Sequence, residues 1–113
     1  MAQRHAQSGE VVSVLPLADA LVGARTTALL KAHQLEIVRI VLHAGQTLRE
    51  HAVPGEITVQ CLEGSLVFST PDAQHELAAG DFIHLAGGVP HALTARIDSS
   101  ALLTICLPAA AAP

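Results

Sequence analysis

The chain has 113 residues and a formal net charge of −4; half of its residues are hydrophobic, yet Phe68 and Phe82 are the only members of the Phe, Tyr and Trp class. This length suffices for one domain with one core, which must be built of Val, Leu, Ile and Ala. The sequence has no basic run, which argues against binding to nucleic acid. It also has no apolar run of roughly 18 residues, which argues against a membrane span. The first ten residues, MAQRHAQSGE, lack the apolar segment of a secretion signal, so we expect a cytoplasmic protein.

Two tails and one short helix are predicted around the main domain. Residues 1–10 and 109–113 are expected to be loose tails, which leaves residues 11–108 as a single domain. In the segment 16-PLADALVGA-24, a proline at the start and a glycine near the end favour one short helical turn. Helix-type periodicity is absent from the sequence that follows.

Short strands are predicted along the rest of the chain. Runs rich in Val, Ile, Leu and Thr recur at short intervals, and each is closed by Gly, Pro or Asp. This spacing is typical of an all-β sandwich or barrel, in which closure limits the exposed strand edges. The predicted strands are residues 25–32, 35–43, 46–51, 57–63, 65–70, 74–79, 81–86, 90–97 and 101–108.

Some of these strands are apolar on both faces. Residues 35–43 and 101–107 look too hydrophobic for the surface of a monomer, and we therefore expect a homodimer, since closed two-fold pairs dominate soluble oligomers. Cys61 and Cys106 lie in runs of the same apolar kind and have no metal-type spacing. Both are predicted to be small core residues.

Glycines and histidines in the second half of the chain form two spaced motifs. Gly45, five residues and His51 open the first motif and 62-LEG-64 closes it, while the second has Gly80 followed by 88-GVPH-91. These motifs resemble those of the cupin superfamily, G-x5-H-x-H-x3–4-E-x6-G and G-x5-P-x-G-x2-H-x3-N. The stretch 51-HAVPGEITVQCLEG-64 is similar to that of small single-domain cupins of the RmlC-like, conserved-barrel (cupin 2) type.

The resemblance implies a fold and a site. The fold would be an all-β double-stranded β-helix, that is, a cupin or jelly-roll barrel, preceded by the short helical turn. The family's usual metal site has four ligands, of which this sequence keeps His51 and His91. The second histidine of the family falls on Val53 and its glutamate falls on Ile57.

A third metal ligand has to come from elsewhere in the chain. His84 is the best candidate, because its strand adjoins the hairpin that carries His91; the alternative is a His84 that is hydrogen-bonded within the barrel wall. Glu56 lies one residue before the family's glutamate position, and a shift of one residue turns a side chain to the opposite face of a strand. Gln60 is the remaining alternative for the third ligand, although it alternates away from the inward-facing set.

Alternation along the strands also predicts the wall of a pocket. Val53 is on the same face of its strand as His51, and Leu93 on the same face as His91. The resemblance implies that Ile57, Val59 and Cys61 also face inward, so these five residues are expected to line the pocket. Arg39 and Arg49 lie on strands that lead into the first motif. Either would bind a carboxylate if it faced the cavity, but a solvated position is favoured for both.

Two functions of different classes follow, and the sequence leaves open whether the protein is an enzyme. In the first, the barrel binds a small apolar or carboxylate-bearing molecule with weak or no metal, and His51 and His91 lie at the pocket mouth. In the second, a metal-dependent enzyme of the oxygenase, isomerase or lyase type uses His51, His91 and a third ligand to hold Fe, Mn, Ni or Zn. Because an ion beside Val53 and Ile57 would be desolvated at a cost, we favour the first.

Overall fold

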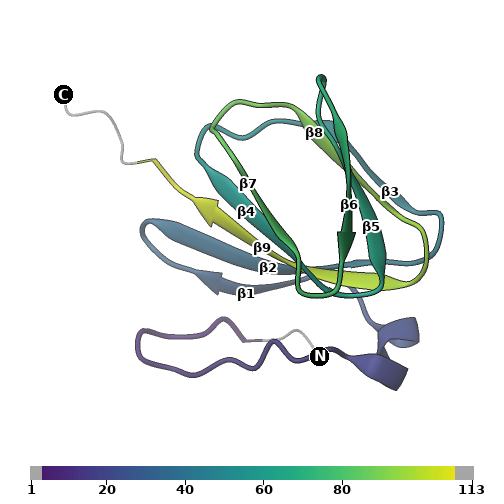
Figure 1. Cartoon of the computed structure of the whole chain (residues 1–113). Coiled ribbons are helices and arrows are strands. Elements are labelled where there is room, and N and C mark those ends of the chain that lie inside the picture. Colours follow the sequence, from purple (N-terminus) through teal and green to yellow (C-terminus); the bar gives the residue numbers. More distant parts are fainter. Residues whose placement is uncertain (1–3, 109–113) are drawn as a thin grey trace.

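The computed structural model describes residues 4–108, and within them each predicted strand is found within two residues of its expected bounds (Figure 1). The all-β prediction is therefore confirmed. The strands are β1 Thr27–Lys31, β2 Leu35–Leu42, β3 Thr47–His51, β4 Ile57–Glu63, β5 Ser65–Ser69, β6 Gln74–Ala78, β7 Phe82–Leu85, β8 His91–Ala95 and β9 Ser99–Cys106.

The strands form two antiparallel sheets. One sheet has five strands in the order β1-β2-β9-β4-β7, and the other has four in the order β3-β8-β5-β6. The chain crosses repeatedly between the sheets, which lie face to face in the arrangement of a jelly-roll barrel (Figure 1). The predicted double-stranded β-helix is thus the observed architecture.

The predicted helical turn is a 3-10 helix, η1, over Ala18–Gly23. It buries Leu21 and leaves Val22 exposed. Within residues 4–108, no helix is long and apolar enough to span a membrane.

The core fills the space between the two sheets. Side chains of β4 alternate between the two faces of the sheet: Ile57, Val59 and Cys61 are buried in the core, and the residues between them are less buried. The buried cluster consists of Ile40, Leu42, Ile57, Val59, Cys61, Leu66, Phe68, Leu77, Leu93, Ala95 and Ala101.

The two cysteines have different environments. Cys61 is completely buried, as predicted, but Cys106 is exposed. The prediction of a core position for Cys106 is wrong because Leu103 and Ile105 of β9 pack against the core, and Cys106 alternates to the outer face.

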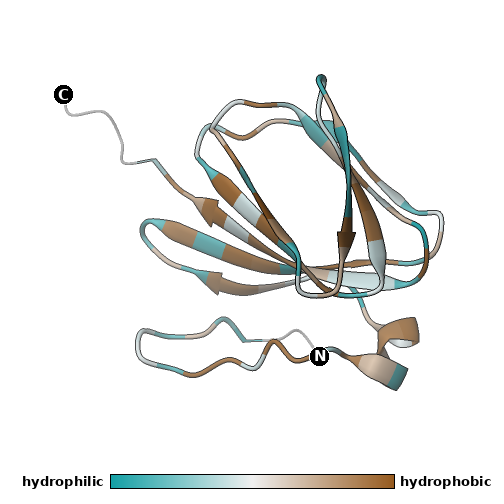
Figure 2. Cartoon of the chain, in the orientation of Figure 1, coloured by the Kyte–Doolittle hydropathy of each residue, from teal (hydrophilic) through white to brown (hydrophobic). Residues whose placement is uncertain are grey.

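Part of the outer face of the five-stranded sheet is covered by residues 4–17, which we call the N-terminal arm. The arm runs beneath β1 and β2 in Figure 1, and its part leading into η1 is hydrophobic (Figure 2). Within the predicted tail of residues 1–10, Arg4 forms an ion pair with Glu10, and the backbone N–H of Ala6 donates to Leu29. The predicted C-terminal tail, residues 109–113, lies outside the described residues.

Arg39 holds this arm to the sheet. Its guanidinium donates to the carbonyl oxygens of Leu15, 3.0 Å away, and Ser13, 3.4 Å away, and the residue is only 7% exposed. The expectation of a solvated Arg39 is therefore wrong. The residue does point away from the barrel interior, but the arm covers that face.

Candidate functional site

Pairing of β3 with β8 brings His51 and His91 together. The two residues are directly opposite each other in this strand pair, and their ring centroids lie 4.4 Å apart with the planes tilted by 55°. His91 is buried, whereas His51 is exposed at the end of β3, so His51 lies at the mouth of the site and His91 inside it.

Backbone carbonyls fix the orientation of both imidazoles. Nδ1 of His51 lies 3.0 Å from the carbonyl oxygen of Arg49, and Nδ1 of His91 lies 3.0 Å from that of Val89. A carbonyl oxygen only accepts hydrogen bonds, so each Nδ1 carries the proton and donates it. In a neutral ring the Nε2 atom is then an unprotonated acceptor.

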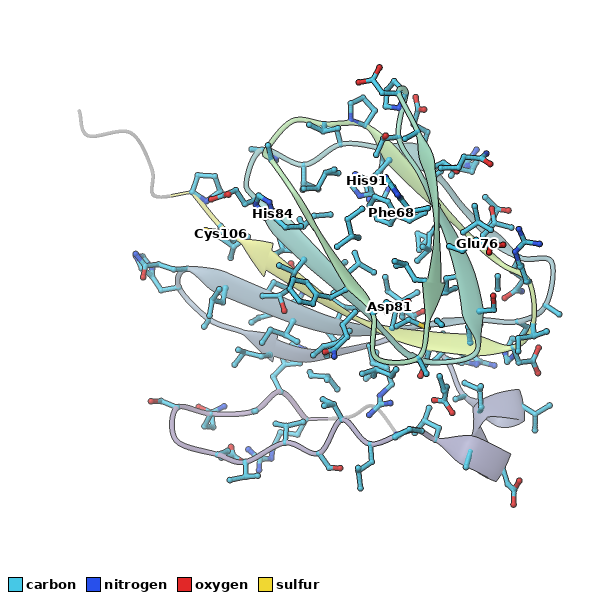
Figure 3. The ribbon with its side chains drawn as sticks, in the orientation of Figure 1. Phe68, Glu76, Asp81, His84, His91 and Cys106 are labelled. Carbon is cyan, nitrogen blue, oxygen red and sulfur yellow. The ribbon has the colours of Figure 1, made fainter. Side chains whose placement is uncertain are left out.

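The ring of Phe68, on β5, stacks on the imidazole of His91. The two rings are nearly parallel, 5° apart, with their centroids separated by 5.6 Å. Figure 3 shows both side chains between the sheets. Phe68 was not among the expected pocket residues. It is two positions from Leu66 on β5, and both are buried, so the two side chains share the inner face of the strand; this spacing is the sequence signal for Phe68.

The histidine pair borders a cavity of about 170 Å³. Apart from the two imidazoles, the hydroxyl of Thr26 is its one polar side-chain group, and none of the described residues that line it is Lys, Arg, Asp or Glu. The lining residues are Thr26, Val38, Ile40, Leu48, His51, Val59, Phe68, His91, Leu93 and Leu103.

Two of the five expected wall residues, Val59 and Leu93, border this cavity, and the other three do not. Ile57 and Cys61 are buried in the core above and below Val59 on β4, and Val53 packs against the core from the loop after β3. The cavity wall includes Val38 and Ile40 of β2, whereas Val59 is the one residue of β4 that borders the cavity. Strand alternation predicts which side chains face inward, but not which of them leave space between them.

The structure does not bring His84 to the histidine pair. Its side chain is 54% exposed, and its Nε2 lies 2.7 Å from Oε1 of Glu56. His84 is opposite Thr58 on the outer face of the sheet, and Figure 3 shows it apart from His91. Gln60 has the same outward parity as Thr58, so all three candidates for a third ligand lie away from the pair.

These donors do not fit a tightly held transition metal. Such an ion normally has three or four protein ligands, whereas the site offers two imidazole nitrogens. Among residues 4–108 no three His, Cys, Asp or Glu side chains lie together in a way that would hold a metal ion. The positions where the family's other ligands fall are occupied by the hydrocarbon side chains of Val53 and Ile57.

Comparison with known proteins identifies relatives of this fold. The family model described as "Cupin domain" matches residues 38–107. No curated protein is a significant match to the chain.

Among solved structures, a conserved protein of unknown function from Streptococcus pyogenes is 25% identical with a TM-score of 0.74, over 97% of this chain and 100% of that one. A cupin superfamily protein from Desulfitobacterium hafniense is 18% identical with a TM-score of 0.76, over 96% and 99% of the two chains. A predicted oxalate decarboxylase from Thermotoga maritima is 23% identical with a TM-score of 0.67, over 74% and 79%. The last two likenesses show the fold alone.

Proposed function

Since this chain belongs to the cupin domain family, we propose that it is a small cupin whose barrel holds a small, mainly apolar molecule with weak or no metal binding. His51 and His91 orient this molecule at the mouth of the cavity. The observation that carries the proposal is the pair of facing imidazoles, 4.4 Å apart, on a cavity otherwise bordered almost entirely by hydrocarbon.

The chemistry of the wall supports binding. Ligand sites are typically apolar concavities in which a few convergent polar groups set the orientation of the molecule. Here Val59, Leu93 and Phe68 supply apolar surface, while the two imidazoles supply hydrogen-bonding nitrogens. Binding of this kind needs no catalytic step.

Thermal unfolding in the presence of small molecules tests the proposal. A molecule that binds the folded chain stabilises it by about 2.7 kcal/mol when its free concentration is 100 times its Kd. We expect such stabilisation in the wild type and its loss in His91→Ala. His33→Ala, which changes an exposed histidine in the turn after β1, is the control and is expected to keep it.

A metal-dependent enzyme is the second candidate, favoured by the free Nε2 atoms of His51 and His91. Elemental analysis of protein purified without an affinity tag separates the two candidates. The binding proposal predicts well under one metal ion per chain after incubation with Fe, Mn, Ni and Zn. About one ion per chain, lost in both His51→Ala and His91→Ala, would instead establish a metal site and overturn the first candidate.

A further inference from the structure

We infer that the cavity selects a neutral ligand about the size of one aromatic ring that donates a hydrogen bond to the imidazoles, and that it disfavours carboxylates. This inference rests on the proposed binding function. It follows from the two carbonyl contacts, from the charges around the cavity and from its volume.

The carbonyl contacts make the pocket a hydrogen-bond acceptor. Because the carbonyl oxygens of Arg49 and Val89 each accept a hydrogen bond from an Nδ1–H, the neutral forms of His51 and His91 both have an unprotonated Nε2. Within the described part of the chain, no protein group donates to either Nε2. A hydroxyl or amine N–H on the ligand would satisfy a lone pair that the protein leaves open.

The charges around the cavity do not favour an anion. Arg39 lies on the outer face, where it binds the arm, and Arg49 is exposed and does not border the cavity. None of the described residues that border the cavity is Lys or Arg, so its wall holds no permanent positive charge. A carboxylate would thus lose its hydration with no fixed cation to replace it.

The size of the cavity limits the ligand to roughly one ring. An apolar protein cavity of about 150 Å³ is known to hold benzene, and the present cavity has about 170 Å³. Phe68, stacked on His91, offers an aromatic surface to such a ring, and Leu93 and Val59 offer aliphatic surface.

Titration calorimetry with five probes of equal ring size tests the inference: phenol, aniline, toluene, anisole and benzoate. Phenol and aniline share the ring of the other probes but donate hydrogen bonds, so we expect them to bind at least tenfold more tightly than toluene and anisole. Benzoate is expected to bind no better than toluene. In His91→Leu, which keeps only the acceptor on His51, the preference for phenol over toluene should fall while toluene binding persists, and His33→Leu should behave like the wild type.

The outcomes separate the ligand class from the proposed function. If all neutral probes bind equally, or if benzoate binds most tightly, the inferred ligand class is overturned and the binding pocket stands. If none of the five probes binds to folded wild-type protein, both the inference and the proposed function fail. Thermal unfolding of His91→Leu without ligand shows whether a reduced preference reflects the pocket or the fold.

Discussion

Glu63 joins three parts of the molecule at the end of β4. Its carboxylate accepts hydrogen bonds from the backbone N–H groups of Leu17, at 2.9 Å, and Ala18, at 3.0 Å, and from the hydroxyl of Ser100. Burial by itself raises the pKa of this carboxyl, but the three hydrogen bonds and the positive charge of Arg39 together lower the pKa below its ordinary value. The charged form is therefore the one that stabilises the fold.

This lowered pKa predicts a loss of stability in acid. The stabilisation by Glu63 is present above the ordinary glutamate pKa of 4.5 and is lost as the pH falls through the lower pKa of the folded chain. Glu63→Gln should reduce the free energy of unfolding by about 1–2 kcal/mol at pH 7. Denaturant titrations should show this difference shrinking towards pH 3. Glu50→Gln, at an exposed position of β3, is the control, and an equal difference at both pH values for Glu63→Gln would contradict the prediction.

Gly64 and Gly80 form a matched pair for testing close packing. Both have positive φ, 93° and 95°, but a Cβ on Gly64 would lie 2.5 Å from the carbonyl oxygen of Asp98, whereas one on Gly80 meets nothing within 4 Å. Gly80→Ala should cost about 1–2 kcal/mol from its backbone conformation alone. Gly64→Ala should cost at least about 2 kcal/mol more, because backbone atoms must move. Equal midpoints of chemical denaturation in the two variants would show that this contact is easily relieved.

At the scale of elements, the N-terminal arm depends on Arg39. Replacement by methionine keeps much of the apolar stem but removes the two hydrogen bonds to arm carbonyls, so Arg39→Met should cost about 1–3 kcal/mol. We expect backbone amides of residues 10–18 to exchange with solvent about tenfold faster in this variant, while those of β4 and β9 are unchanged. Arg25→Met, at an exposed position before β1, is the control. Faster exchange throughout the barrel would mean that Arg39 supports the whole fold rather than the arm.

The strands and the histidine pair were predictable from the sequence, whereas the arm was not. Strand alternation and turn residues are local, so β1 to β9 and the approach of His51 to His91 follow from short stretches and the two motifs. The positions of Arg39 and Cys106 depend on what covers the outer face of a sheet. That is a tertiary property, because Arg39 contacts arm residues that lie 24 and 26 positions before it, and the arm has no strand pattern of its own. The empty volume beside Val59 is likewise a result of packing across two sheets.

At the scale of the whole molecule, the homodimer stays a prediction, but the apolar surface that would form it is now on the N-terminal arm and not on the strands beneath the arm. The arm covers part of the apolar outer face that suggested a partner, but its own outward side exposes Val11 by 98% and Leu15 by 74%. If a second copy covers this side, the double substitution Val11→Ser and Leu15→Ser should weaken the dimer at least tenfold in sedimentation equilibrium. Ile97→Ser, which changes an exposed apolar residue before β9, should leave it unchanged. A monomeric wild type would rule the dimer out.

The two cysteines differ in exposure, and this difference allows the rate at which the barrel opens to be measured. Cys106 is exposed, whereas Cys61 is buried in the core, where burial raises the pKa of its thiol and slows its reaction with alkylating reagents. A thiol reagent added to folded protein therefore modifies Cys106 first, and it modifies Cys61 only when the barrel opens. The rate of the second modification, read as a mass increment, measures how often the two sheets separate in the native state.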